Sequence, residues 1–226
     1  MKSGRKPPFQ SDESYTAVIG DMLASRALQG RQRLRVQTEF NDFVALMNRR
    51  YKAALVSEFA ITLGDEFQCI LADPTVLPDI IWDISRADRF PQLRLGIGFG
   101  RIDTLIPRQA INLDGPALHN ARTAIEKAKS DKLLGGVFHG FGDTIDTVAN
   151  GIARLLRFHI SKRSETQLRV LDLLRSGHTQ IEIAKKIGRT PQAVSDHKNA
   201  AGWEAYEAGE RALRQILRID KPAGVP

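Results

Sequence analysis

The chain contains a single cysteine, Cys69, among its 226 residues, so it cannot form an intrachain disulfide. Because Cys69 lies in an apolar run, we expect it to be a buried core thiol. The impossibility of an intrachain disulfide fits a reducing, cytoplasmic compartment. The sequence also lacks any apolar run near the ~20 residues that a membrane-spanning helix requires. Its basic start, MKSGRKPPFQ, is followed by no long apolar stretch, which argues against a signal peptide and predicts a disordered leader over residues 1–13.

Neither hydrophobic nor charged residues are in excess: they make up 42% and 26% of the chain, which is ordinary for a globular protein. The length suits one large domain or two smaller ones. Acidic residues are outnumbered by basic ones, and the net charge of +7 suits polyanionic partners such as nucleic acid or nucleotide phosphates. A solvated basic surface is the simpler explanation of the same charge.

The first 163 residues predict alternating strands and amphipathic helices. Apolar and β-branched runs predict the strands, and apolar residues at helical spacing predict the helices. The strands are expected at 15–19, 59–63, 67–71, 93–99 and 136–138. The first helix is expected from just after Gln29-Gly30 to about Arg50, and the others at about 73–87, 118–128 and 144–160. A β-α-β-β-α-β order with additions is the ferredoxin-like arrangement of an α+β domain, in which the first strand lies beside the third and antiparallel to it.

Two adjacent carboxylates lie at the tip of the predicted hairpin Phe59–Leu71, where Gly64 precedes Asp65 and Glu66. Asp21 follows the first strand, so the expected strand pairing would bring it to the same sheet edge. Carboxylates that converge at one edge are suitable ligands for a hard cation such as Mg²⁺ or Mn²⁺. Ordinary turn chemistry also explains Gly64 and Asp65, so both interpretations stay open.

Glycine occupies one face of the strand at 93–99. Its apolar residues alternate with Arg94, Gly96, Gly98 and Gly100. A face with almost no side chains allows another group to approach the backbone closely.

Taken in order, these motifs resemble those of class III nucleotidyl cyclases. The resemblance covers roughly residues 14–140 and rests on Gly20-Asp21 followed by Ser25, Gly64-Asp65 in a hairpin, LRLGIGFG, and DGPALHNAR before an Ala-rich helix. The pattern is most similar to the SatD family, small bacterial proteins with this cyclase-like core. The resemblance implies that Asp21 and Asp65 hold divalent cations that bridge a nucleoside triphosphate, with Glu66 as a further candidate ligand. The candidate nucleotide contacts are Gly20, Ser25, Arg26, Gly64 and Arg122.

The helix after the glycine turn departs from the cyclase pattern. Active class III cyclases carry an Asn and an Arg four residues apart on that helix, whereas the aligned positions here are His119 and Thr123. Asn120 and Arg122 are shifted by one residue, which turns a side chain by about 100° around a helix. Ile61 also stands where the family has a lysine. We therefore expect nucleotide or metal binding, with an active nucleotidyl cyclase or nucleotidyltransferase as the alternative.

Residues 164–220 predict a second, all-α domain. Thr179 and Glu182 form a capping box that begins a short helix, Gly188 ends it, and Thr190-Pro191 begins the next helix. Two short helices joined by a tight turn are typical of a helix-turn-helix. The segment TQIEIAKKIGRTPQAVSDH resembles the helix-turn-helix of sigma-factor and LuxR-type DNA-binding modules.

Double-stranded DNA is the partner that such a module predicts. One face of the last of these helices carries Gln192, Ser195, Asp196 and Asn199, which would enter the major groove. Asp196 repels phosphates and suits only a cytosine amino group. The candidate phosphate contacts are Lys185, Lys186, Arg189 and Lys198. Trihelical units also serve in protein contacts, and a solvated helix surface accounts for the basic residues without DNA.

A final amphipathic helix follows Gly202, with Trp203, Tyr206 and Leu213 on its apolar face. Core packing explains this face, and the seam of a homodimer is the alternative, because operator-binding modules work in pairs. Residues 221–226 are expected to form a disordered tail. The predicted organisation is thus a leader, a cyclase-like domain over 14–163, a helix-turn-helix domain over 164–220 and the tail.

The sequence favours a cytoplasmic DNA-binding transcriptional regulator whose cyclase-like domain senses a nucleotide together with a metal. An active cyclase is one alternative. A module with neither ligand nor catalysis, in which the acids are only turn residues, is another.

Overall fold

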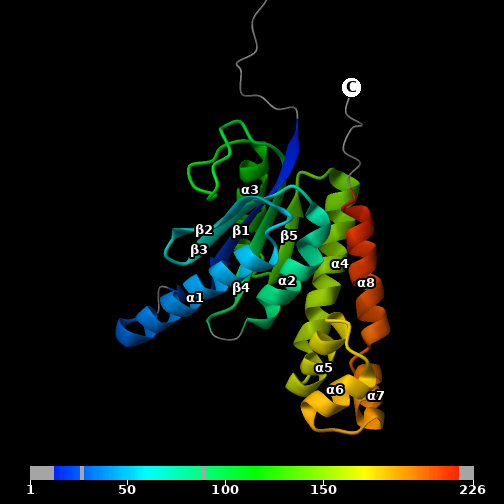
Figure 1. Cartoon of the computed structure of the whole chain (residues 1–226). Coiled ribbons are helices and arrows are strands. Elements are labelled where there is room, and N and C mark those ends of the chain that lie inside the picture. Colours follow the sequence, from blue (N-terminus) through cyan, green and yellow to red (C-terminus); the bar gives the residue numbers. More distant parts are fainter. Residues whose placement is uncertain (1–12, 26–27, 88–89, 219–226) are drawn as a thin grey trace, which may run out of the picture.

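The computed structural model describes residues 13–25, 28–87 and 90–218. The expected leader, apart from Glu13, and the expected tail lie outside these ranges, as does Arg26. The protein is of mixed α+β class, with one five-stranded sheet and helices on both of its faces (Figure 1). In the described ranges no helix is long and apolar enough to cross a membrane.

The sheet has the strand order β2-β3-β1-β4-β5. Its strands are β1 (Ser14–Met22), β2 (Leu55–Leu63), β3 (Glu66–Leu71), β4 (Leu93–Arg101) and β5 (Gly135–His139). β1 pairs antiparallel with both β3 and β4, which confirms the prediction that the first strand lies beside the third. β5 pairs parallel with β4. β1 is longer than predicted and continues through Gly20 and Asp21, because both neighbouring strands keep pairing with it to that point.

Three helices cover one face of the sheet: α1 (Gly30–Arg50), α2 (Leu77–Arg86) and α4 (Asp143–Ser161). The predicted helix at 73–87 divides in two, since a short 3-10 helix, η2 (Pro74–Val76), capped by the Asp73 side chain, leads into α2.

The core between these helices and the sheet is dense. Phe40 of α1, Phe67 of β3 and Leu95 of β4 are fully buried in it. Cys69 is also fully buried there, which confirms the predicted core thiol, and burial raises the pKa of that thiol.

The opposite face of the sheet is covered by α3 (Pro116–Ser130), which lies directly on the glycine face of β4. A β-carbon added to Gly96 or Gly98 would overlap the α3 backbone at Ala121, closer than any real β-carbon approaches. The group that approaches the bare face of β4 is therefore a helix of the same chain. Small residues on both elements permit this close packing.

Four helices follow α4: α5 (Glu165–Arg175), α6 (Gln180–Ile187), α7 (Pro191–Ala200) and α8 (Trp203–Ile216). The predicted capping box of Thr179 and Glu182 is present, and Gly188 adopts the left-handed conformation that ends α6. Helices α5, α6 and α7 share a small core of their own, formed by Val170, Ile183, Ala184 and Val194.

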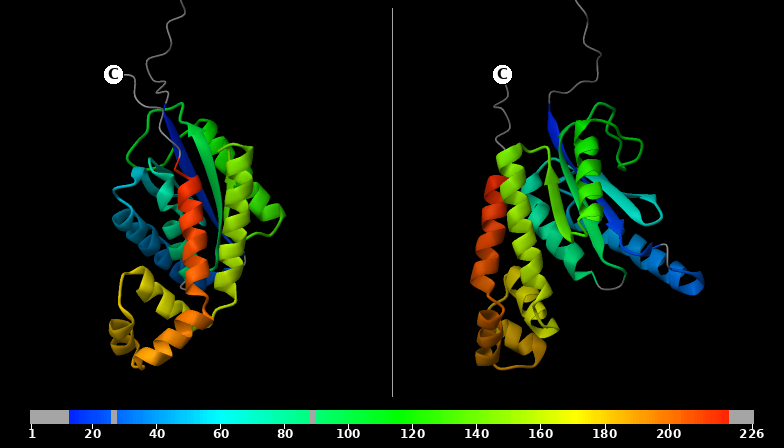
Figure 2. Two further views of the ribbon diagram at one scale, coloured as in Figure 1. Left: turned by 90° about the vertical axis from the view of Figure 1, so that its right-hand side faces the viewer. Right: turned by 180° about the vertical axis from the view of Figure 1, so that it is seen from behind.

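Helix α8 turns back and packs against α4, α2 and η2 (Figure 2). Tyr206 and Leu213 are buried, and Trp203 packs against the same core, so core packing is the correct interpretation of its apolar face. This core also contains Leu168 and Leu171 of α5. Hydrophobic contact is thus continuous across the predicted boundary at residue 163.

Candidate functional site

The three predicted metal-binding acids lie at one end of the sheet. Asp21 of β1 and Glu66 of β3 are direct partners in the strand register, and the backbone N–H of Met22 donates to the carbonyl of Asp65 at 3.0 Å. The predicted convergence of these residues is confirmed. Glu66 is the first residue of β3 and is only 4% exposed, whereas Asp65 remains in the turn.

Each acid already has partners within the chain. Arg122 of α3 binds Glu66 through both guanidinium nitrogens, at 2.7 and 2.9 Å, and Thr62 lies 3.2 Å from the same carboxylate. Bidentate pairs of this kind are among the stronger charge-assisted hydrogen bonds. Asp21 lies 3.4 Å from the ammonium nitrogen of Lys129 and 3.8 Å from the guanidinium of Arg94.

The Asp65 carboxylate accepts a short hydrogen bond from the hydroxyl of Ser25, in the connection between β1 and α1. Burial raises the pKa of Asp21; Lys129 opposes that shift, and the nearby charges of Asp65 and Glu66 add to it. The electrostatic repulsion among these three carboxylates at one sheet edge is thus offset by basic side chains from α3 and β4.

A metal fits this arrangement only in part. Across the described ranges, no group of three or more His, Cys, Asp or Glu side chains is placed to hold a metal ion. A divalent cation shared by Asp21 and Asp65 would have to displace Lys129 from Asp21, and Arg122 occupies Glu66. The Mg²⁺ or Mn²⁺ site therefore stays a prediction.

The candidate nucleotide contacts also have roles in the fold. A side chain at Gly20 would overlap the ring of Phe67, so packing alone requires glycine there. Gly64 lies in an exposed turn close to the Gln37 side chain, and Arg122 is held by Glu66. Because Arg26 is outside the described ranges, its contribution stays a prediction, as do those of the other four residues.

The polar residues of α3 that replace the cyclase Asn and Arg are engaged locally. The Asn120 amide donates to the carbonyl of Phe99 at 2.8 Å, and His119 contacts Asp114 at 2.8 Å. The Thr123 hydroxyl donates to the carbonyl of His119. Asn120 thus anchors α3 to β4, which weighs against a catalytic role for its side chain.

The Glu66–Arg122 pair leads to a stability prediction. Arg122→Ala should lower the free energy of unfolding by about 2–3 kcal/mol, less than the full cost of breaking a buried ion pair because Arg122 is half exposed. Glu66→Gln should cost less, since the freed guanidinium can turn toward water while the freed carboxylate cannot. Urea unfolding of both variants measures this, with Lys127→Ala on the exposed side of α3 as control. Equal losses for the two variants would contradict the argument.

The candidate DNA-binding residues gather on α6, α7 and the turn between them. Gln192, Asp196 and Asn199 are exposed, and Ser195 and Lys198 are half-buried. The Gln192 amide donates to Asp196 at 3.0 Å, while Lys198 lies 3.8 Å from Glu204 of α8. The remaining candidates, Lys185, Lys186 and Arg189, are all exposed.

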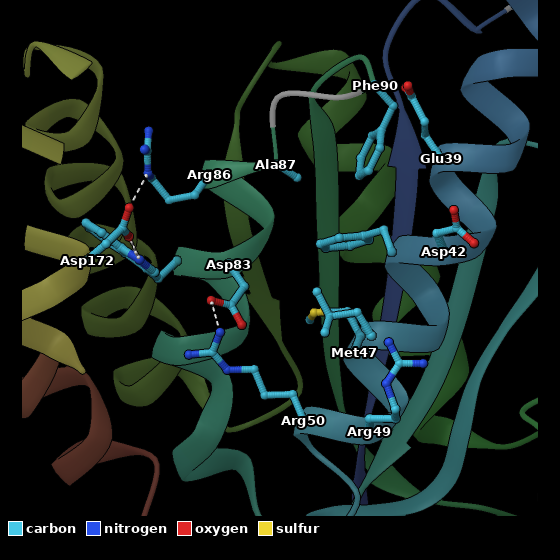
Figure 3. Close-up of a pocket in the computed structure, with 13 residues that line it drawn as sticks. Glu39, Asp42, Met47, Arg49, Arg50, Asp83, Arg86, Ala87, Phe90 and Asp172 are labelled. Atoms are coloured by element: carbon cyan, nitrogen blue, oxygen red, sulfur yellow. Dashed lines mark hydrogen bonds and ion pairs between the residues drawn. The ribbon is translucent and has the colours of Figure 1, made fainter. Parts of the chain in front are cut away.

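Sequence analysis missed a groove of about 410 Å³ between α1, α2 and α5. Figure 3 shows Glu39 and Asp42 of α1 on one side, Asp172 of α5 on the other, and Asp83 and Arg86 of α2 between them. Most of its charges are paired: Arg50 with Asp83 at 3.1 Å and Arg86 with Asp172 at 3.3 Å. Its lining residues span positions 39 to 172, so no local motif identifies it. The groove lies on the face of the sheet that α1, α2 and α4 cover. This face is opposite to α3 and away from Asp21, Asp65 and Glu66.

A second feature that the sequence did not reveal is a set of ion pairs between α2, α5 and α8, here called the joint: Asp79, Arg175, Glu210 and Arg214. Arg175 contacts Asp79 at 2.7 Å, binds Glu210 closely, and stacks over the Trp82 ring at 4.7 Å. Arg214 also binds Asp79, at 2.9 Å. Nearby, the Trp82 indole donates to Asp172 of α5 at 2.7 Å. These contacts fasten α5 and α8 to α2.

Comparisons with known proteins identify the family to which the chain belongs. No curated protein matches the chain. A crystal structure of a regulator of polyketide synthase expression from Bifidobacterium adolescentis is similar over 93% of this chain and 80% of that one, with 15% identity and a TM-score of 0.25. A likeness at that TM-score does not bear on fold or function. The family model of SatD matches residues 15–211, nearly the whole chain, and the protein therefore belongs to the SatD family.

Proposed function

We propose that this protein is a cytoplasmic DNA-binding regulator that reads double-stranded DNA through α6 and α7. The observation that carries the proposal is the exposed polar face of α7, which follows a short helix and a left-handed glycine turn. In a helix-turn-helix, the second helix of this kind enters the major groove. Helices α6 and α7 lie at one end of the molecule, away from the sheet (Figure 1), and this position leaves room for a duplex.

The proposed reading face is Gln192, Ser195, Asp196 and Asn199. Glutamine and asparagine amides can bind adenine with two hydrogen bonds. In the free protein, the Gln192 amide donates to Asp196, so it must release Asp196 before it can bind a base. Asp196 thus acts against non-specific binding, both by holding Gln192 and by repelling phosphates.

A selection experiment with random duplexes at low salt tests the proposal. We expect an enriched sequence, and a failure to retain any duplex would overturn the proposal. In the same assay, Lys186→Ala should weaken binding about equally for all sequences and reduce the salt slope by about one. Lys52→Ala, exposed beyond the end of α1, is the matched control and should leave the slope unchanged.

Asp196→Ala should bind duplex DNA severalfold more tightly than the wild type, with the largest gain on non-specific sequences. Removal of one negative charge from the face strengthens phosphate attraction, and Gln192 no longer has to break a hydrogen bond. Titration of a fluorescent duplex measures the effect. Asp131→Ala changes another exposed aspartate, just after the end of α3, and controls for net charge alone; an equal gain for that variant would contradict the local argument.

We further infer that the sheet domain is a sensor of a nucleotide with Mg²⁺ or Mn²⁺ at Asp21 and Asp65. Two observations support this inference: the position of β1 between β3 and β4, which a ferredoxin-like arrangement would require, and the crowding of the acids at one sheet edge. Calorimetry with each nucleoside triphosphate and Mg²⁺ should give heat that Asp65→Ala abolishes. No cyclic product is expected, because Asn120 is engaged with Phe99. An absence of heat with every nucleotide would favour a domain in which the acids are only structural.

A further inference from the structure

The outer face of α4 carries an unusual stripe of exposed apolar side chains. Val148, Leu155 and Phe158 are 41%, 70% and 62% exposed, and helical spacing places them on one side together with the exposed Gly151. Single exposed apolar residues are normal, but three on one stripe of a helix mark a contact surface. We call these four residues the α4 stripe.

Helix α8 lies beside α4 and runs antiparallel to it (Figure 2, left). Gly209 of α8 lies against Leu156, and His159 stacks near Tyr206, so the end of α4 is level with the start of α8. The exposed side of α8 carries small residues at Ala205, Ala208 and Ala212. The two helices therefore present a ridge of large side chains next to a flat strip of small ones.

Charge differs between the two helices at the same level. Lys162 caps the end of α4 and is exposed. Glu204 lies in the first turn of α8, and its side chain is 87% exposed, with a 3.8 Å contact to Lys198. The surface is thus positive where α4 ends and negative where α8 begins. Such a surface can be complementary to a copy of itself, and its acidic part is unsuited to an anionic lipid surface.

We propose that a second copy of this chain covers the α4 stripe, giving a two-fold dimer with a four-helix bundle at its centre. The two-fold axis runs parallel to α4, so that α4 of each copy lies antiparallel to α8 of the other. Leu155 and Phe158 then pack against the alanines of α8, and Lys162 meets Glu204 of the partner subunit. Arg154 of α4 and Arg211 of α8 lie at a similar height along the bundle and remain at the solvent-exposed rim of the interface.

An axis in this direction has a consequence for DNA reading. It places the α5–α7 units of both copies at the same end of the dimer, since both lie beyond the same end of α4 (Figure 2). Paired helix-turn-helix units that face one duplex bind two half-sites about one helical turn apart. This consequence rests on the proposed function, whereas the dimer itself does not.

Sedimentation equilibrium of the full chain without DNA tests the dimer. We expect twice the 25.1 kDa monomer mass at micromolar concentration. Leu155→Asp should weaken association by about 100-fold or more, as expected for a central contact present twice. Leu105→Asp removes an equally exposed leucine from the loop before α3 and should leave the mass unchanged. A wild-type chain that stays monomeric overturns the proposal and leaves the stripe to a different partner.

A charge exchange tests the direction of the axis. Lys162→Glu and Glu204→Lys should each weaken the dimer, and the double variant should restore it, because the two residues meet across the interface. A dimer that the double variant fails to restore would overturn this arrangement. Loss of DNA binding from an intact dimer would instead count against the proposed function alone, so the two failures are distinguishable.

Discussion

Arg175→Ala is expected to destabilise the protein by about 3–5 kcal/mol, the cost of breaking a buried ion pair by removing one partner. Arg175 is mostly buried and serves two acids at once, Asp79 of α2 and Glu210 of α8. Without the guanidinium, Glu210 is left buried with little compensation, and one oxygen of its carboxylate has no hydrogen-bond partner even in the wild type. Chemical denaturation at neutral pH measures the loss.

The same variant should respond to pH in a definite direction. Burial raises the pKa of Glu210, and the charge of Arg175 opposes that shift. Removal of Arg175 therefore raises the pKa of Glu210 further in the folded state. A raised carboxyl pKa favours the folded state at low pH, so the deficit should be largest at neutral pH and shrink as the pH falls toward that pKa.

Arg169→Ala is the matched control for Arg175, since Arg169 is an exposed arginine on the same helix. It should change stability by about 0.5 kcal/mol or less, as surface substitutions usually do. A deficit of Arg175→Ala that is independent of pH would show that lost packing on Trp82, and not the unpaired Glu210 carboxylate, is responsible.

Gly98→Val should destabilise the protein by at least ~3 kcal/mol, beyond the usual range for an overpacked core. The reason is that the atoms which the new side chain would overlap belong to the backbone of α3. A β-carbon at Gly98 meets the amide nitrogen of Ala121 and the carbonyl of Ala117, and neither can rotate away as a side chain could. Helix α3 would have to lift from β4, which would also separate Arg122 from Glu66. Thermal unfolding followed by circular dichroism measures the loss.

Gly151→Ala provides the control for Gly98. Gly151 lies in the interior of α4 with open space around its position, so alanine there should stabilise the monomer by about 0.5–1 kcal/mol through helix propensity. Comparison at concentrations below those of association keeps the proposed dimer out of this measurement. A Gly98→Val protein of wild-type stability would mean that α3 does not rest on β4 as described.

One helix connects the two regions on which the proposed regulation depends. α1 begins after the loop that contains Ser25, which binds Asp65, and it ends at Arg50, which pairs with Asp83 of α2. Asp83 also accepts a hydrogen bond from Tyr51 at 2.7 Å. If a nucleotide at Asp65 shifts α1, we expect the response in the contact between α2 and α5. A response of the Trp82 fluorescence to nucleotide would measure it, because Trp82 donates to Asp172 of α5.

Local sequence patterns predicted most of the elements. The capping box at Thr179, the turn at Gly188 and the apolar spacing of α1 and α4 are encoded within a few residues, and the structure contains all of them. The pairing of Asp21 with Glu66 was also predictable, because the order of strands restricts which neighbours are available. Local patterns did not predict features that depend on interaction partners from distant parts of the chain. The burial of Glu66 depends on Arg122, which is 56 residues away.

The sequence by itself determined the α+β class, the buried thiol, the convergence of the acids at one sheet edge and the two short helices that meet at Gly188, since each follows from periodicity, caps and strand order. Only the tertiary structure decided that the acids face basic side chains, that α3 fills the glycine face of β4, and that Arg175 joins α2 to α8. The physical reason is the distance along the sequence over which each kind of interaction acts. Propensity and capping act within a turn or two of helix, whereas ion pairs, long-range hydrogen bonds and close packing depend on which residues, up to 139 positions apart, the fold brings into contact.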